Sequence, residues 1–202
     1  MIGAVIQARL GSRRLPRTVL ADIAGKPLLT RVIERVRQVS GVERVVVATP
    51  VGDLPELQAV VREPVFWWGG AGEDVLARYV GAARSFGLDP IMRITADCPL
   101  LDPAACDRVL RAYQTGGFDY VSNVHPSTDG LDCEVFSWWA LEETSRCAIL
   151  RKDREHVTSW MRRRLQCRFV AEPPLPDKWS VDTAQDLARV RDAWTSSNAL
   201  NV

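Results

Sequence analysis

Residues 2–20 read Ile2-Gly3-Ala4-Val5-Ile6-Gln7-Ala8-Arg9-Leu10-Gly11-Ser12-Arg13-Arg14-Leu15-Pro16-Arg17-Thr18-Val19-Leu20. The apolar start of this segment has the β-branched residues Val5 and Ile6 at its centre, which predicts a buried β-strand. The strand gives way to a loop that carries Gly11, Ser12 and four arginines. The segment therefore predicts a strand that ends in a basic, glycine-containing turn.

The loop has the chemistry of a phosphate-binding turn. Gly11 lets backbone N–H groups turn toward an anion, and Ser12 adds a hydroxyl donor. Arginine side chains suit phosphate oxygens, to which they can donate two hydrogen bonds at once. A first strand that feeds such a turn commonly places a nucleotide phosphate at the carboxyl edge of an α/β sheet. The loop matches neither G-x-G-x-x-G nor the Walker pattern, and on the residues alone a solvated basic turn is an equal alternative.

The composition is that of an ordinary globular protein. The chain has 202 residues, 47% hydrophobic and 25% charged, which fits one domain with a real core. Its formal net charge of +1 argues against a nucleic-acid binder, which needs a basic excess. Only Lys26, Lys152 and Lys178 of the 26 basic residues are lysine, so a single arginine is weak evidence for phosphate binding.

Cysteine usage and hydropathy predict a cytoplasmic protein. The five cysteines are odd in number and form no C-x-x-C pair, which indicates reduced thiols rather than a disulfide framework or a zinc site. No signal peptide or 18-residue apolar span is evident, so no membrane partner is expected. The pairs Trp67-Trp68 and Trp138-Trp139 could form apolar contacts in a homodimer.

Strand and helix patterns alternate along most of the chain. This alternation predicts a single α/β domain over residues 1–195, a mostly parallel twisted sheet with helices on both faces, and a frayed tail over 196–202. Strands are expected at residues 42–49, 65–68, 90–95, 118–124, 133–136, 167–171 and 179–181. Helices are expected to start at Leu28 and Pro103 and to span residues 54–62, 73–86, 138–147 and 153–165, with a last helix after Asp182.

Several polar residues occupy positions where either a ligand or the fold could use them. Asp97 follows the central strand, where a carboxylate can hold Mg²⁺ or serve as a turn residue. Asp182 precedes Thr183-Ala184-Gln185-Asp186, a capping-box-like start, and could simply mark the beginning of the helix. Asp129, Asp132 and Glu134 crowd three carboxylates into six positions, which suits acceptor hydroxyls or an amine, a metal, or a solvated hairpin. The same choice between ligand contact and structural role holds for Thr49, Arg78 and His156.

A series of motifs resembles one enzyme family. It begins with Gln7-Ala8-Arg9-Leu10-Gly11-Ser12-Arg13-Arg14-Leu15-Pro16 and continues through Glu73 to Tyr79, Arg93 to Leu100, Asp119 to Asn123, Asp129 to Phe136, Arg154 to Thr158 and Trp179 to Thr183. Together they are similar to the cytidylyltransferases of spore-coat polysaccharide biosynthesis, which are related to the synthetases of CMP-activated acidic sugars (acylneuraminate and KDO).

The resemblance implies a fold, a reaction and partners. The fold is the Rossmann-like one of nucleotide-diphospho-sugar transferases. The expected partners are CTP, Mg²⁺ and a small sugar-like acceptor. An acceptor oxygen attacks the α-phosphate of CTP and pyrophosphate leaves, a reaction that needs positioning and charge neutralisation more than a protein nucleophile.

The same resemblance implies roles for individual residues. Arg14, Arg17, Asp97 and Asp182 are expected to be catalytic, and the two aspartates to bind Mg²⁺. The nucleotide is assigned to Gln7, Ala8, Arg9, Leu10, Gly11, Ser12, Thr49 and Arg78. The acceptor is assigned to Asn123, Asp129, Asp132, Glu134, Arg154 and His156.

Two departures from the family pattern open alternatives. The motif lysine that supports the phosphates is replaced by Thr18, and the glycine before the metal aspartate is Ala96. One alternative is a glycosyltransferase that consumes a nucleotide sugar, and the other is a nucleotide-binding module without catalysis. Within the cytidylyltransferase reading, Arg17 is the candidate to take over the role of the lost lysine, because its side chain is long enough to cover a one-residue offset.

Overall fold

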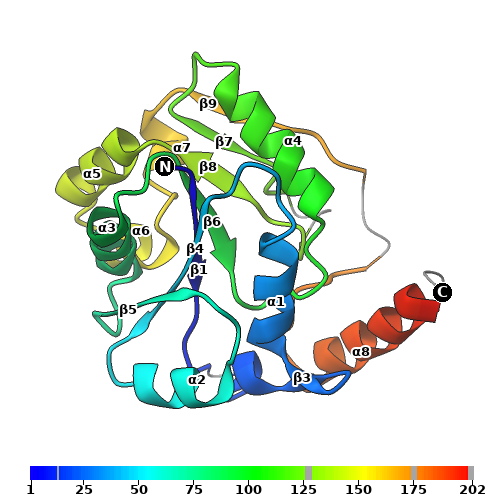
Figure 1. Cartoon of the computed structure of the whole chain (residues 1–202). Helices are drawn as coiled ribbons and strands as arrows, with labels where there is room; N and C mark the ends of the chain where they lie inside the picture. Colours follow the sequence, from blue (N-terminus) through cyan, green and yellow to red (C-terminus); the bar gives the residue numbers. More distant parts are fainter. Residues whose placement is uncertain (13, 126–128, 174–176, 200–202) are drawn as a thin grey trace.

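A seven-stranded sheet forms the centre of the protein (Figure 1). The computed structural model describes residues 1–12, 14–125, 129–173 and 177–199. The strands of the sheet lie in the order β5-β4-β1-β6-β8-β7-β9, and β2 and β3 form a separate pair. Their bounds are β1 Gly3–Gln7, β2 Asp22–Ile23, β3 Lys26–Pro27, β4 Arg44–Pro50, β5 Phe66–Gly70, β6 Ile91–Thr95, β7 Tyr120–Ser122, β8 Glu134–Phe136 and β9 Cys167–Phe169.

The sheet is mostly parallel, as predicted. Strand β1 pairs in parallel with β4 on one side and β6 on the other, so that Gln7 lies opposite both Ala48 and Thr95. Strand β8 runs antiparallel to its neighbours β6 and β7, and β9 is parallel to β7. The carboxyl ends of β1, β4 and β6 therefore meet at one edge of the sheet.

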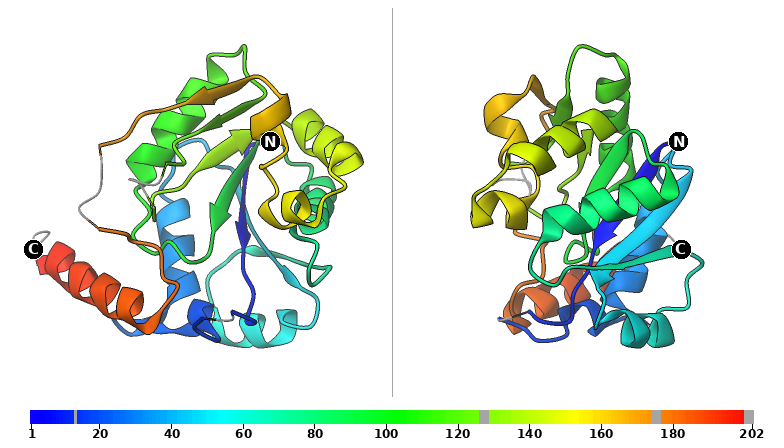
Figure 2. Two further views of the ribbon diagram at one scale, coloured as in Figure 1. Left: turned by 180° about the vertical axis from the view of Figure 1, so that it is seen from behind. Right: turned by 90° about the vertical axis from the view of Figure 1, so that its left-hand side faces the viewer.

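Helices cover both faces of the sheet. One core contains side chains of α1, α4 and α8, and the other contains side chains of α3, α5 and α7. Figure 2 shows α3, α5 and α6 grouped together. No helix within the described ranges combines the length and apolarity needed to cross a membrane. The helices are η1 Thr18–Leu20 (3₁₀), α1 Leu28–Val36, α2 Leu54–Val60, α3 Val75–Phe86, α4 Pro103–Gln114, α5 Trp138–Cys147, α6 Arg151–His156, α7 Met161–Arg164 and α8 Ala184–Ala199.

The apolar run of β1 is explained by these two cores. Side chains alternate between the faces of a strand, and here both faces are covered. Ala4 and Ile6 enter the core with α1, whereas Val5 enters the core with α3. All three side chains are fully buried, so the strand holds the loop that follows it at a fixed place on the sheet edge.

Two expectations from the sequence need correction. The helix expected over 153–165 is broken, because Val157 has a left-handed φ of 56° that an α-helix cannot contain. The segment 179–181 forms no strand; its backbone bonds singly to Asp129 and Asp97 instead. The last helix continues past Ser196 to Ala199, and residues 200–202 lie outside the described residues.

Candidate functional site

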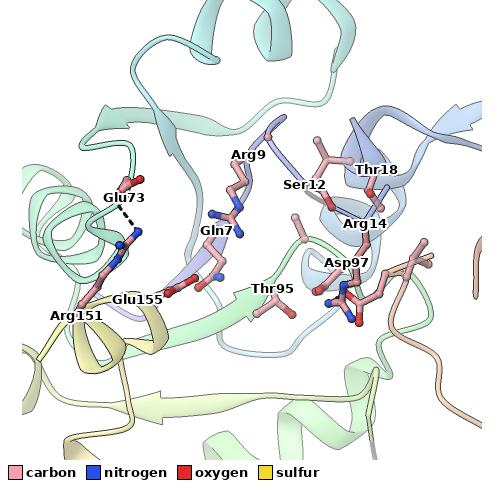
Figure 3. A pocket seen from close by; sticks show the side chains of 15 residues that line it. Gln7, Arg9, Ser12, Arg14, Thr18, Glu73, Thr95, Asp97, Arg151 and Glu155 are labelled. Atoms are coloured by element: carbon pink, nitrogen blue, oxygen red, sulfur yellow. Dashed lines mark hydrogen bonds and ion pairs between the residues drawn. The ribbon is translucent and has the colours of Figure 1, made fainter. Parts of the chain in front are cut away.

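A cleft of about 590 Å³ opens at the carboxyl ends of β1 and β6. Gln7 and Thr95 end these strands and line the cleft, together with Asp97 just beyond β6 (Figure 3). After β1 the chain builds β4 and β5 on one side, then returns to place β6 on the other side. The cleft thus lies at the topological switch point of the sheet, the usual ligand site of open α/β folds.

The loop after β1 forms one wall of the cleft. Its backbone is folded back on itself, because the N–H groups of Ser12 and Arg17 both donate to the Leu10 carbonyl, over 3.0 and 2.9 Å. The Leu10 N–H donates to the Asp53 carboxylate at 2.8 Å, which ties the loop to the start of α2. Gly11 has open space where a side chain would project. The predicted phosphate-binding residues Arg9, Gly11, Ser12 and Arg14 all line the cleft.

The two predicted metal aspartates come together at this wall. The Val181 N–H donates to the Asp97 carbonyl at 2.8 Å, and Asp97 and Asp182 both line the cleft. The carboxylate of Asp182 forms ion pairs with Arg14 and Lys178. Burial opposes the charged ammonium, but the hydrogen bond and charge of Asp182 raise the pKa of Lys178 overall.

The helix start next to Asp182 is capped by other residues. The Thr183 N–H donates to the Asp186 carboxylate at 2.9 Å, and the Asp186 N–H donates back to the Thr183 hydroxyl at 3.2 Å. This is the predicted capping box. Because Thr183 and Asp186 satisfy the helix end, the side chain of Asp182 is left to face the cleft.

The opposite wall was missed by the sequence analysis. It consists of Glu73, Arg151 and Glu155, and within this wall Arg151 donates to Glu73 at 3.1 Å (Figure 3). Glu73 was expected only within the motif Glu73 to Tyr79 and in the helix over residues 73–86. The cap of α3 is instead Asp74, whose carboxylate accepts from the Ala77 N–H at 2.9 Å. Glu73 and Glu155 lie in motifs of the sequence analysis, but no local signal showed that α6 would bring Arg151 and Glu155 next to Glu73.

A smaller pocket of about 160 Å³ adjoins the cleft. Gln7 and Arg9 line both, while Ala8, Arg78 and His156 line only the smaller one. Arg78 is buried and its Nη1 donates to the carbonyls of Ala71 and Gly72, at 2.5 and 2.7 Å. Burial lowers the pKa of Arg78. Within the described part of the chain, Gln7 Oε1 is a buried acceptor without a partner, which makes it available to a bound group.

The three carboxylates predicted for the acceptor are separated by the fold. Glu134 is 1% exposed and accepts hydrogen bonds from Arg93, from the Tyr120 hydroxyl at 2.5 Å and from the Thr158 hydroxyl at 2.6 Å. Its burial works against the charge, but Arg93 and the hydroxyl donors lower the pKa of Glu134 overall. The position of Glu134 corrects its assignment to the acceptor: the carboxylate is fully engaged inside the sheet.

Asp132 and Asp129 line neither cavity. Burial, followed by the charges of Glu134 and Asp129, raises the pKa of Asp132 to about 7. Asp132 Oδ1 is buried and has no hydrogen-bond partner among the described residues. The Asp129 carbonyl accepts from the Trp179 N–H at 2.9 Å, so this loop supports the segment that carries Asp182.

Five other predicted residues line neither cavity. One is Leu10, whose backbone is bonded to Asp53 inside the loop. Asn123 clamps its own loop, because its Oδ1 accepts from the Cys133 N–H at 2.8 Å. Thr49 is fully buried in β4. Arg154 donates to Asp74 at 2.7 Å and so ties α6 to α3. Arg17 has a left-handed φ of 60° and forms an ion pair with Glu56 of α2, away from the cleft.

The carboxylate pair is chemically suited to a hard cation. In the described ranges, no group of three or more His, Cys, Asp or Glu side chains is arranged to hold a metal ion. Mg²⁺ normally takes only one or two protein carboxylates and completes its coordination with water and substrate phosphates. Asp97 and Asp182 fit that requirement.

A basic loop facing two carboxylates at the switch point of a parallel sheet defines an α/β protein with a nucleotide-phosphate site. The sequence pattern of the cytidylyltransferase family matches residues 3–173. The chain therefore belongs to the cytidylyltransferase family. The match ends before Lys178 and Asp182.

Individual relatives agree with this family. The chain is 27% identical to the spore coat polysaccharide biosynthesis protein SpsF of Bacillus subtilis, covering 93% of this chain and 83% of that protein. It is 34% identical to an uncharacterised protein of Methanocaldococcus jannaschii, over 84% of this chain and 71% of the other. A 3-deoxy-manno-octulosonate cytidylyltransferase of Chlorobium phaeobacteroides is 37% identical, but over only 55% of this chain and 45% of that protein.

Solved structures show the same fold. A cytidylyltransferase from Leptospira borgpetersenii superposes with a TM-score of 0.87 at 25% identity, covering 96% of this chain and 87% of that one. A CMP:2-keto-3-deoxy-manno-octonic acid synthetase complexed with CTP gives a TM-score of 0.79 at 21% identity, with 98% and 100% covered.

Proposed function

We propose that the chain transfers CMP from CTP to an oxygen of a sugar-like acceptor. The acceptor oxygen forms a bond to the α-phosphorus, the bond from that phosphorus to the bridging oxygen breaks, and pyrophosphate leaves. The observation that carries this function is the cleft itself, in which Arg9, Ser12 and Arg14 face Asp97 and Asp182. The similarity to the cytidylyltransferase family, to SpsF and to the 3-deoxy-manno-octulosonate cytidylyltransferase supports it.

Each part of the cleft has a role in this reaction. Arg9, Ser12 and Arg14 bind the phosphates, because guanidinium and hydroxyl donors match phosphate oxygens. Asp97 and Asp182 would hold Mg²⁺, which supplies neutralisation of the phosphate charge when bound. Gln7 lies between the cleft and the smaller pocket, where its free amide oxygen can orient the nucleotide.

The wall formed by Glu73, Arg151 and Glu155 is assigned to the acceptor. Carboxylates accept hydrogen bonds from sugar hydroxyls, and Arg151 donates to hydroxyl or carboxylate oxygens. This wall faces the phosphate loop across the cleft, as Figure 3 shows. An acceptor bound there would lie on the side of the nucleotide opposite Asp182.

A cytoplasmic location and a homodimer remain predictions. The tryptophan pairs proposed as contacts differ in exposure: Trp67 and Trp68 are half-buried, whereas Trp139 is 54% exposed. Size-exclusion chromatography with light scattering, on wild type and on Trp139→Ser, tests the dimer.

The base specificity can be tested by thermal shift. We expect CTP with Mg²⁺ to raise the unfolding midpoint more than ATP, GTP or UTP, because a ligand selective for the native state stabilises it by mass action. Pyrophosphate release from CTP with a candidate sugar then tests turnover. Equal shifts for all four triphosphates would remove the cytidylyl assignment. Release of a nucleoside diphosphate from a nucleotide sugar would favour a glycosyltransferase, and binding without turnover a non-catalytic module.

A further inference from the structure

The phosphate loop lacks one cation that the reaction requires. A triphosphate in transfer needs its charge neutralised by positioned cations. Thr18 lines the cleft, but its hydroxyl donates to the Leu15 carbonyl and carries no charge. Arg17 pairs with Glu56 of α2 and does not line the cleft. Neither Thr18 nor Arg17 therefore supplies a charge to the cleft, where Arg9 and Arg14 are the cations of the loop among the described residues.

Lys178 is paired with a residue of the cleft. It does not itself line the cavity, but its ammonium pairs with Asp182, a lining residue, and its side chain is 33% exposed. The other two lysines of the chain lie elsewhere: Lys26 pairs with Glu34, and Lys152 is exposed on α6.

The backbone around Lys178 is fixed to the core of the site. The Lys178 carbonyl accepts from Arg189 Nε of α8 at 3.1 Å, and the next residue, Trp179, donates to Asp129. Gly130 makes this approach possible: its φ is +106°, and a side chain there would lie 2.5 Å from the Trp179 Cβ. The backbone that carries the Lys178 side chain is therefore held in place beside Asp182.

Two cations meet at Asp182. Arg14 binds Oδ1 and Lys178 binds Oδ2, and the Lys178 ammonium also lies 3.9 Å from a carboxylate oxygen of Asp186. When a polyanion enters, one of these cations can bind phosphate oxygens while the other stays on Asp182. Arg14 belongs to the phosphate loop, whereas Lys178 approaches from the opposite end of the chain.

We propose that Lys178 binds the triphosphate, and then the pyrophosphate, in the role of the lysine that Thr18 replaces. This role rests on the proposed function. It is specific to the segment after residue 173, where the family match ends.

The presence of only three lysines allows a direct binding measurement. Reductive methylation with ¹³C-formaldehyde keeps each amine charged and gives one set of signals for each lysine and one for the N-terminus. Single Lys→Arg variants assign the signals. We expect sodium pyrophosphate, and CTP with or without Mg²⁺, to shift the Lys178 signal and leave those of Lys26 and Lys152 unchanged. A Lys178 signal that does not move while the protein binds CTP would overturn the assignment.

Calorimetric titration of variants with pyrophosphate shows whether Lys178 binds the ligand or only stabilises the fold. Lys178→Ala should weaken pyrophosphate binding at least about tenfold, which equals about 1.4 kcal/mol. Lys178→Arg should keep most of the affinity, and the matched control Lys152→Ala should stay within about twofold. Thr18→Lys should restore part of the affinity lost in Lys178→Ala.

Three results would contradict the proposal, and each has a different meaning. If Lys178→Ala lowers only the unfolding midpoint and leaves the pyrophosphate Kd unchanged, Lys178 is a structural tie. If Arg17→Ala weakens binding more than Lys178→Ala does, Arg17 supplies the charge. If the wild-type protein binds neither pyrophosphate nor CTP, the proposed function itself fails, and Lys178 fails with it.

Discussion

Replacing Glu134 with glutamine should lower the free energy of unfolding by about 3–5 kcal/mol, the usual cost of removing one partner of a buried ion pair. The side chains of Glu134 and Arg93 are 2% and 13% exposed, so water cannot compensate the arginine that remains. Tyr120 and Thr158 also lose the charged acceptor of their hydroxyl hydrogen bonds. Against a typical total stability of about 5–15 kcal/mol, such a loss is readily measured by urea denaturation.

Two further variants test whether the buried charge is the cause. Glu142 pairs with Arg84 over 3.9 Å at the surface, with side chains 56% and 68% exposed. Glu142→Gln should therefore change stability by less than about 0.5 kcal/mol. Arg93→Met combined with Glu134→Leu should recover most of the loss, because an apolar pair of similar volume leaves no unpaired charge.

The pH dependence of the free energy of unfolding is a second, independent test of the role of Glu134. The folded protein holds the pKa of Glu134 below its ordinary value of 4.5, so the unfolded chain binds the proton more readily. The contribution of Glu134 is thus present above pH 4.5 and is lost as the pH falls through the folded pKa. Glu134→Gln should remove that slope. A Glu134→Gln protein as stable as wild type, but impaired in CTP turnover, would refute the structural role and return Glu134 to the substrate site.

Three other outcomes are expected. Asp97→Asn and Asp182→Asn should each reduce pyrophosphate release by orders of magnitude while the urea midpoint stays close to wild type, because each removes a metal carboxylate. If Asp182→Asn lowers stability alone, the role of Asp182 is its ion pair with Arg14. The pKa of Asp132 is about 7 in the folded protein and 3.8 ordinarily, so the stability of wild type should fall between about pH 4 and pH 7 in protein kept free of metal with EDTA. Asp132→Asn should remove this fall, and parallel pH profiles for the two proteins would count against it. Gly130→Ala should cost at least about 1–3 kcal/mol by thermal denaturation, because φ is +106° and the new Cβ would meet Trp179, whereas Gly72→Ala has open space and should be tolerated.

The phosphate wall of the cleft was predictable because it depends on local pattern and on the topology of parallel sheets. Val5 and Ile6 mark β1, the loop follows it directly, and Asp97 follows a neighbouring strand. The Thr183 capping box was also readable from four consecutive residues. These features need no knowledge of distant contacts.

The other wall and the acidic cluster were not predictable in the same way. Val157 at φ 56° is a rare backbone state for a β-branched residue, and it ends α6 where the sequence pattern continues. Glu134 was grouped with its sequence neighbours, but its partner Arg93 lies directly opposite on β6. That pairing is set by the antiparallel placement of β8, which no local signal encodes.

The ion pair between Arg14 and Asp182 joins residues 168 positions apart. During synthesis the phosphate loop leaves the ribosome long before the segment that carries Lys178 and Asp182. The strands β1, β4 and β6 are all synthesised while the basic loop still lacks both the carboxylate and the second cation. Nucleotide affinity should therefore arise only late in chain elongation. Premature termination just before residue 178 would keep every described strand in the sequence but remove α8, whose Leu187, Val190 and Trp194 belong to one of the two cores, so that both the fold and the ligand site would be incomplete.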